Sequence, residues 1–250
     1  MVHTYTAFCL FNPVQRYKNQ SYEGANAGLI MTLCIILCRG RTIHAKGQTM
    51  EEKIEFSSES LAIEGLLEKN SETSGAVITH PHPLYGGNMH NQVVMAITRV
   101  YQKLGYTTLR FNFRGVGASQ GSYADGVGEQ QDVRSAIAYL TDLGIDRIDL
   151  AGYSFGAWVN AHLNCRHEGI ANMVMVSPPV AFIGFESVNG IDCLKLIVTG
   201  SRDDIAPADL IKQSYPQWNP EAHLEVISGA DHFYGGYTDE LEEILSSHLK

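Results

Sequence analysis

The spacing of hydrophobic positions changes repeatedly along the chain from residue 52 onward. Residues 52–58 and 61–69 alternate apolar and polar side chains around a polar break, which predicts an antiparallel pair of strands. Short apolar runs predict further strands, and apolar side chains three and four residues apart predict helices. The further predicted strands are residues 75–80, 106–113, 147–153, 170–177, 193–200 and 222–229, and the predicted helices are residues 91–105, 128–144, 155–167, 207–215 and 238–250.

This alternation of strands and helices predicts an α/β fold. We expect a mostly parallel, twisted sheet of about eight strands with helices on both faces. In such sheets, functional sites form at the carboxyl ends of the strands. The loops that follow the predicted strands are therefore the places to look for chemistry.

The first 49 residues differ from the rest of the chain. They hold five basic residues and one acidic residue, and residues 27–38 form an uncharged apolar run of twelve. A membrane span needs roughly 17 to 25 residues, so we expect no stable span, although the run has the length of a signal-peptide core. We expect residues 50–250 to form the catalytic domain and residues 1–49 to be a leader, either disordered or signal-like.

Charge and cysteine content narrow the class of protein. The net charge of −9 over 250 residues argues against a nucleic-acid-binding surface. The five cysteines (Cys9, Cys34, Cys38, Cys165 and Cys193) are scattered and form no zinc pattern. We interpret them as reduced thiols of a cytoplasmic protein. Export is the alternative, if residues 1–45 act as a signal sequence.

The segment GYSFG, residues 152–156, follows the predicted strand 147–153 and opens a predicted helix. It fits the G-x-S-x-G pattern of a nucleophile elbow, in which a sharp turn exposes the serine. Gly152 and Gly156 would relieve crowding at that turn. Ser154 is therefore the candidate nucleophile, and a simple helix-capping serine is the alternative.

A serine nucleophile needs a base, and the base needs an acid that orients it. His232 follows the last predicted strand, and Asp203 follows the strand before it. The order Ser154, Asp203, His232 matches one known nucleophile-elbow architecture. Asp204 competes with Asp203 for the role of acid, and the sequence does not separate the two.

The loop HPHPLYGGNMH, residues 80–90, follows the strand 75–80 and is the candidate oxyanion loop. Its two prolines have no N–H, so the backbone of His82 or Leu84 is the candidate donor, with His82 preferred. The N–H of Phe155, directly after the nucleophile, is the second candidate. Leu84, Tyr85 and Tyr153 are candidate substrate-binding residues. A zinc site on the histidines of this loop is the less favoured alternative, and we expect no metal and no cofactor.

The segment FRGVGASQG, residues 113–121, follows another strand. Its glycine spacing fits neither the P-loop nor the dinucleotide-binding pattern. We interpret it as a tight turn with a buried structural arginine, Arg114.

Together, these segments resemble the α/β-hydrolases over about four-fifths of the chain. The motifs HPHPLYGG, FNFRGVGASQG, GYSFG, GSRDDIAP and GADHF occur in family order. The first two resemble a group related to dienelactone-hydrolase-like and serine-aminopeptidase-like members. The resemblance implies Ser154 as nucleophile, Asp203 as acid and His232 as base, with an oxyanion hole at the 80–84 loop and Phe155.

One departure from many members concerns the lid. Residues 178–192 are all that separates two predicted strands, which is too short for a large lid domain. Phe182, Ile183 and Phe185 in this segment could form a small flap or simply pack the loop.

These observations predict a serine esterase with a catalytic triad. The enzyme would act on a small-molecule ester, thioester or similar acyl bond through an acyl-enzyme intermediate. A serine peptidase of the same fold and a non-catalytic binding protein are the alternatives. The oligomeric state is left open, with a homodimer as one possibility.

Overall fold

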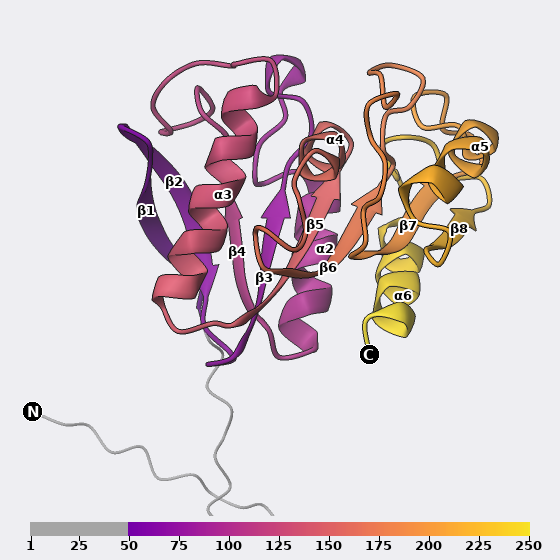
Figure 1. Cartoon of the computed structure of the whole chain (residues 1–250). Helices are drawn as coiled ribbons and strands as arrows, with labels where there is room; N and C mark the ends of the chain where they lie inside the picture. Colours follow the sequence, from indigo (N-terminus) through magenta and orange to yellow (C-terminus); the bar gives the residue numbers. More distant parts are fainter. Residues whose placement is uncertain (1–49) are drawn as a thin grey trace, which may run out of the picture. The chain divides into compact units, whose positions relative to one another are not determined.

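The computed structural model describes residues 50–250, so the expectations for residues 1–49 lie outside the described residues. Eight strands form one sheet in the order β1-β2-β4-β3-β5-β6-β7-β8 (Figure 1). The strands are β1 (Glu52–Ser58), β2 (Leu61–Glu68), β3 (Ser74–Thr79), β4 (Thr107–Phe111), β5 (Arg147–Tyr153), β6 (Ile170–Val176), β7 (Leu194–Gly200) and β8 (His223–Ile227). The helices are η1 (Pro83–Tyr85), α2 (Gln92–Lys103), α3 (Val127–Asp142), α4 (Phe155–Ala161), α5 (Ala208–Trp218) and α6 (Thr238–His248).

The sheet is antiparallel only at its first edge. Strand β1 pairs antiparallel with β2, and β2 pairs antiparallel with β4. All the pairs from β4 to β8 are parallel. The predicted α/β fold is confirmed, including the opening antiparallel pair and the count of strands.

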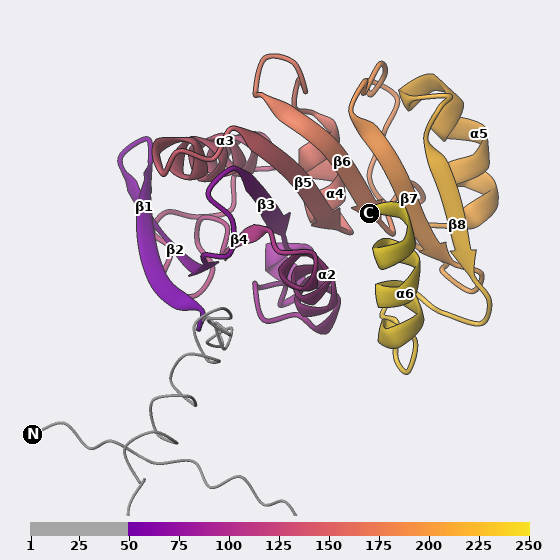
Figure 2. The ribbon, with the colours of Figure 1, turned by 90° about the horizontal axis from the view of Figure 1, so that it is seen from below.

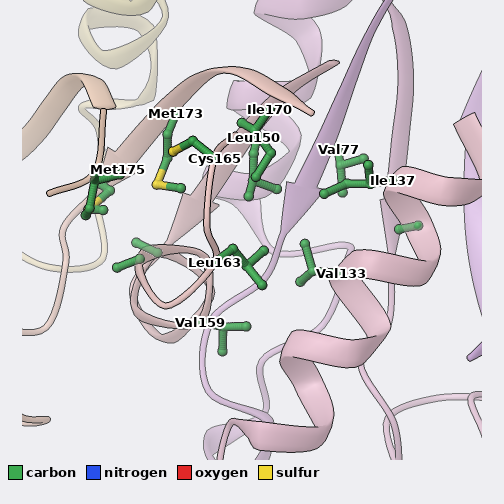
Figure 3. Close-up of a cluster of buried hydrophobic side chains, with 14 of the residues drawn as sticks. Val77, Val133, Ile137, Leu150, Val159, Leu163, Cys165, Ile170, Met173 and Met175 are labelled. Carbon is green, nitrogen blue, oxygen red and sulfur yellow. The ribbon is translucent and has the colours of Figure 1, made fainter. Parts of the chain in front are cut away.

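Helices cover both faces of the sheet, as predicted (Figure 2). Helices α3, α4 and α5 contribute to one hydrophobic cluster, and α2 and α6 contribute to the other. In the first cluster, Val133 and Ile137 point from α3 toward the strand residues Val77 and Leu150 (Figure 3). The central strands are apolar on both faces because helices bury both faces.

Two helices differ in length from their predictions. Helix α4 ends at Ala161 rather than at residue 167, and the chain then turns, so that Leu163 packs in the core. Helix α5 continues through Pro216 to Trp218, although a proline normally ends a helix. Trp218 is buried and its ring lies 4.9 Å from that of Phe185, and this packing stabilises the last turn.

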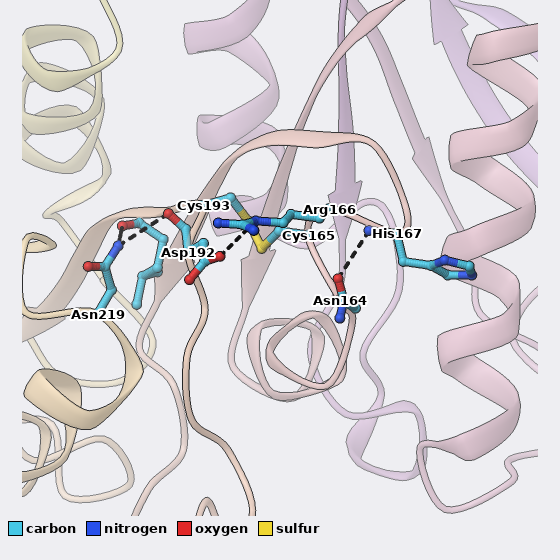
Figure 4. The surroundings of a disulfide bond; sticks show 8 residues. Asn164, Cys165, Arg166, His167, Asp192, Cys193 and Asn219 are labelled. Carbon is cyan, nitrogen blue, oxygen red and sulfur yellow. Dashed lines mark hydrogen bonds and ion pairs between the residues drawn. A yellow bond between two sulfur atoms is a disulfide. The ribbon is translucent and has the colours of Figure 1, made fainter.

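The prediction that all five cysteines are reduced is wrong for two of them. Cys165 and Cys193 form a disulfide bond across 28 residues (Figure 4). Cys165 lies beyond the end of α4, and Cys193 directly precedes β7. The backbone N–H of Met173 in β6 donates to the carbonyl of Cys193, so the pairing of β6 with β7 contributes to placing Cys193. Only the folded sheet brings these cysteines together, and their spacing carries no sign of it.

The connection between β6 and β7 carries no lid domain. Residues 177–193 contain no regular helix or strand, which agrees with the prediction. Within residues 50–250, none of the helices has the length and apolar character needed to cross a membrane.

Candidate active site

The loops that follow β3, β5, β7 and β8 carry the candidate residues to one edge of the sheet. Ser154 lies between β5 and α4 with φ +55° and ψ −119°, a backbone conformation that is strained for a residue with a side chain. Its N–H donates to the carbonyl of Val176 in β6, and its carbonyl accepts from the N–H of Trp158. The turn is therefore held from both sides.

The two glycines of the motif are required by close packing. A Cβ atom on Gly152 would lie 2.5 Å from Nδ2 of Asn160, and one on Gly156 would lie 2.6 Å from Oγ1 of Thr79. Both distances are shorter than any normal contact. The predicted role of Gly152 and Gly156, relief of crowding at a sharp turn, is supported by these distances.

Ser154, His232 and Asp203 form a continuous chain of hydrogen bonds. Oγ of Ser154 lies 2.9 Å from Nε2 of His232, and Nδ1 of His232 lies 2.9 Å from each carboxylate oxygen of Asp203. A carboxylate only accepts, so Nδ1 carries the imidazole proton. The other nitrogen, Nε2, is then free to accept the hydroxyl proton of Ser154.

The surroundings of Asp203 keep it ionised. Burial alone would raise the pKa of Asp203, but hydrogen bonds from His232 and from the N–H of Ala206 hold that pKa below its usual value. The N–H of Ile205 also donates to the same carboxylate. Asp204 is exposed, and among the described residues it is Asp203 that contacts His232.

Of the two candidate donors in the candidate oxyanion loop, His82 and Leu84, one N–H is free. The N–H of Leu84 donates to Nδ1 of the His82 ring at 3.2 Å, so this donor is already used. Within residues 50–250, the N–H of His82 makes no backbone or side-chain hydrogen bond. Phe155 is the first residue of α4, so its N–H has no acceptor one turn earlier in the helix.

A cavity of about 460 Å³ opens beside Ser154. Tyr85 and Tyr153 line it, whereas Leu84 is not among the lining residues and is 67% exposed. The hydroxyl of Tyr153 donates to the carbonyl of His232, so it helps to hold the loop that carries this histidine. The lining residues are Pro81, His82, Tyr85, Gly86, Gly87, Asn91, Tyr153, Ser154, Phe155, Pro179, Phe182, Ile183, Ile205, His232 and Phe233.

Several of these lining residues are absent from the sequence-based candidates. Phe233 directly follows His232, and Ile205 lies in the same loop as Asp203, so proximity to the motifs could have indicated both. Phe182 and Ile183 line the cavity, whereas Phe185 packs in the core against Trp218. The segment between β6 and β7 thus both lines the cavity and packs against the core, the two roles that the sequence left open.

His80 is a buried structural histidine rather than a metal ligand. The N–H of Phe113 donates to its Nε2 at 3.0 Å, so Nδ1 carries the proton and donates to the carbonyl of Pro81. These bonds fix the start of the candidate oxyanion loop. Among the described residues, no group of His, Cys, Asp and Glu side chains could hold a metal ion.

Burial gives His80 a measurable effect on stability. Burial lowers its pKa from 6.5 to about 4, despite the hydrogen bond to Pro81. Between these pH values the unfolded chain binds a proton that the folded chain does not, so stability rises with pH across this window. We expect the free energy of unfolding to fall by about 3 kcal/mol between pH 6.5 and pH 4 because of His80 alone.

Urea unfolding of the wild type and of His80→Gln at pH 6.5 and pH 4 measures the contribution of His80 to the free energy of unfolding. The variant should lose less stability on acidification, because the other titrating groups are common to both proteins. His90→Gln, which removes an exposed histidine from the same loop, should keep the wild-type pH dependence. Identical slopes for His80→Gln and the wild type would contradict the assignment.

Comparisons with known proteins agree with this geometry. No family model matches the chain. An uncharacterised protein of Rickettsia prowazekii is 35% identical over 209 residues, which are 79% of this chain and 88% of that protein. The solved structure of an α/β serine hydrolase homologue from Coxiella burnetii is 35% identical, covers 80% of this chain and 98% of its own, and superposes with a TM-score of 0.74. The chain belongs to the α/β-hydrolase superfamily.

A third relative bears on the lid. A solved α/β serine hydrolase without a lid, from Xanthomonas campestris, is 25% identical to this α/β-hydrolase, covers 81% of this chain and 95% of its own, and superposes with a TM-score of 0.73. The described part of this α/β-hydrolase likewise has only an irregular segment between β6 and β7. The comparisons support a hydrolase of this fold.

Proposed function

We propose that this α/β-hydrolase is a serine hydrolase that cleaves an ester, thioester or related acyl bond. The observation that carries the proposal is the chain of hydrogen bonds from Ser154 through His232 to Asp203, at the wall of a largely apolar cavity. A serine with a base in reach, itself oriented by a buried acid, is the arrangement that activates a hydroxyl for attack.

In the proposed reaction, Oγ of Ser154 attacks the substrate carbonyl while Nε2 of His232 takes the hydroxyl proton. The tetrahedral intermediate then collapses, and His232 passes that proton to the leaving group. A water molecule, activated by the same nitrogen, hydrolyses the acyl-enzyme and restores Ser154. Asp203 stabilises the imidazolium that forms in each half of the reaction.

Stabilisation of the developing oxyanion is assigned to two backbone N–H groups. Phe155 follows the nucleophile at the start of α4, and His82 precedes the short helix η1. Donors of this kind act in a water-poor site where they need not reorganise during the reaction. The hydrogen bond between Leu84 and the His82 ring favours His82 over Leu84 as the second donor.

The cavity favours an uncharged acyl substrate over a peptide. Among the described residues that line it there is no Asp, Glu, Lys or Arg. An aminopeptidase would need an acidic group to bind the substrate ammonium, and a charged substrate would lose hydration without gaining a partner. We therefore propose a small neutral ester or thioester, with no nucleic-acid partner.

One observation argues against the predicted cytoplasmic location. The Cys165–Cys193 disulfide is a bond that persists mainly in oxidising compartments. It favours the alternative, in which the chain is exported. Alkylation of thiols in intact cells before lysis, followed by peptide mass spectrometry, would show whether this pair is oxidised in the cell.

Labelling with a fluorophosphonate probe tests the proposed nucleophile directly. We expect the probe to modify Ser154, because an activated serine attacks the phosphorus centre as it would attack a carbonyl. The variant Ser154→Ala should lose the label. Ser201→Ala, which changes an exposed serine in another strand-end loop, should keep it.

Hydrolysis of a p-nitrophenyl ester series by the wild type, with a peptide p-nitroanilide series beside it, tests the substrate class. Turnover of esters without turnover of anilides supports the proposal. No labelling of Ser154 and no turnover of any ester would favour the non-catalytic binding protein instead.

A further inference from the structure

Three aromatic side chains stand exposed around the mouth of the cavity. Tyr85 is 73%, Phe182 57% and Phe233 64% exposed, and all three also line the cavity. They come from three different loops, which follow β3, β6 and β8. Gathered exposed apolar side chains of this kind mark a place where a ligand or partner covers them.

Two of these rings meet across the mouth. The rings of Tyr85 and Phe182 lie 5.9 Å apart at an interplanar angle of 70°, an edge-to-face contact between the oxyanion loop and the segment between β6 and β7. The ring of His82 lies 4.9 Å from Tyr85 and 4.6 Å from Phe155. A continuous series of rings thus runs from the mouth of the cavity to the residue after Ser154.

Two polar side chains of the cavity wall already have hydrogen-bond partners. Oδ1 of Asn91 accepts from the N–H of Val93, and the hydroxyl of Tyr153 donates to the carbonyl of His232. Burial lowers the pKa of His82, which favours the neutral form of its ring. A ligand in this cavity therefore meets ring faces, ring edges and aliphatic groups more often than hydrogen-bonding groups.

We propose that Tyr85 and Phe182 form an aromatic clamp across the cavity mouth, and that this clamp selects neutral substrates that carry an aromatic ring. The inference deepens the proposed function and rests on it, because the substrate is taken to be an ester that reaches Ser154. A planar ring that enters the cavity can pack against the two side chains and present its edge or face to both. A saturated ring of the same size buries similar area but lacks the π system.

Matched pairs of esters test the clamp. Ethyl 3-phenylpropionate and ethyl 3-cyclohexylpropionate differ only in the ring, which two methylene groups separate from the carbonyl. The acetates of 3-phenylpropanol and 3-cyclohexylpropanol place the same rings on the alcohol side. We expect kcat/KM to favour the phenyl member of at least one pair by about three- to tenfold.

Variants at the clamp separate ring chemistry from plain hydrophobicity. Phe182→Tyr keeps a ring and should keep the preference, whereas Phe182→Leu and Tyr85→Leu keep apolar bulk and should lose it. Leu143→Ala removes an exposed apolar side chain at the end of α3 and should leave the preference unchanged. Equal kcat/KM values within both pairs for the wild type, or a preference that survives both leucine variants, would overturn the clamp.

Binding to Ser154→Ala keeps this test independent of turnover. Calorimetry with the same four esters should show tighter binding of the phenyl member, with the same dependence on Tyr85 and Phe182. If no ester is hydrolysed but this binding preference is present, the proposed function fails and the clamp stands. If esters are hydrolysed but binding and kcat/KM are the same for the phenyl and the cyclohexyl esters, the aromatic clamp is wrong and the proposed hydrolase activity is supported.

Discussion

Replacement of Asp203 by Asn is expected to lower kcat for ester hydrolysis by about 10,000-fold. Asparagine has nearly the same size, so its oxygen can still accept from the N–H groups of Ile205 and Ala206. Its NH2 group would then face Nδ1 of His232, where the aspartate now accepts. The imidazole would move its proton to Nε2, and Nε2 could no longer accept the proton of Ser154.

Asp204→Asn is the matched control, because it makes the same chemical change one residue away. Asp204 is exposed, and its replacement should change kcat by no more than about twofold. Steady-state kinetics of p-nitrophenyl acetate hydrolysis, with thermal unfolding of each variant to confirm the fold, make the comparison. A large loss in Asp204→Asn together with a small loss in Asp203→Asn would reverse the assignment of the acid.

The fold and the loops that carry the candidate chemistry could be predicted because both depend on local patterns. A change of hydrophobic period marks each strand and helix, and parallel strands must end at the same edge of the sheet. Ser154 and His232 could therefore be named before their distance was known. The distance of 2.9 Å from Oγ of Ser154 to Nε2 of His232 comes only from the three-dimensional structure, because a sequence pattern holds no distances.

The choice between Asp203 and Asp204 could not be made from sequence, because adjacent residues point in different directions. Asp203 and Asp204 have the same chemistry, and only the turn after β7 buries one and exposes the other. His82 and Leu84 both carry an N–H, and the hydrogen bond from Leu84 to the His82 ring distinguishes them. Such differences arise from backbone angles of single residues.

Long-range contacts were the other source of error. The disulfide joins Cys165 to Cys193 because of how β6 and β7 pair. Helix α5 passes Pro216 because Trp218 packs on Phe185. At Pro216 a tertiary contact overrides a local signal for the end of a helix, whereas for the two cysteines the sequence holds no local signal at all. The aromatic side chains at the cavity mouth are a third case, because three separate loops contribute them.

Asp132→Ala is expected to reduce the free energy of unfolding by about 3 to 5 kcal/mol. Asp132 in α3 is fully buried, and its carboxylate accepts from the backbone N–H, Nε and Nη2 of Arg114 and from Oγ of Ser58. The hydrogen bonds to Asp132 raise the pKa of Arg114 above its usual value, so the guanidinium stays charged. Without Asp132, the charged partner that remains for this buried guanidinium among the described residues is the more distant Glu59, at 3.4 Å.

Urea unfolding of Asp132→Ala beside Glu168→Ala measures this difference. Glu168 pairs at 2.8 Å with Arg134, which lies in α3 as Asp132 does. The side chain of Arg134 is 35% exposed, so the loss of this ion pair should cost no more than about 1 kcal/mol. Replacing both partners, in Arg114→Met with Asp132→Leu, should recover much of the stability, because no unpaired charge remains. Equal losses in the two single variants would contradict a buried pair.

The same pair also links stability to the proposed site. The loop that Arg114 begins leads to Tyr123, whose ring lies 5.1 Å from that of His82 and 5.9 Å from that of Phe155. If Arg114 and Asp132 fix this loop, Asp132→Ala should also raise KM for esters under conditions where the variant remains folded. An unchanged KM in the folded variant would show that the loop keeps its position without the pair, and that His82 and Phe155 are held by their other ring contacts.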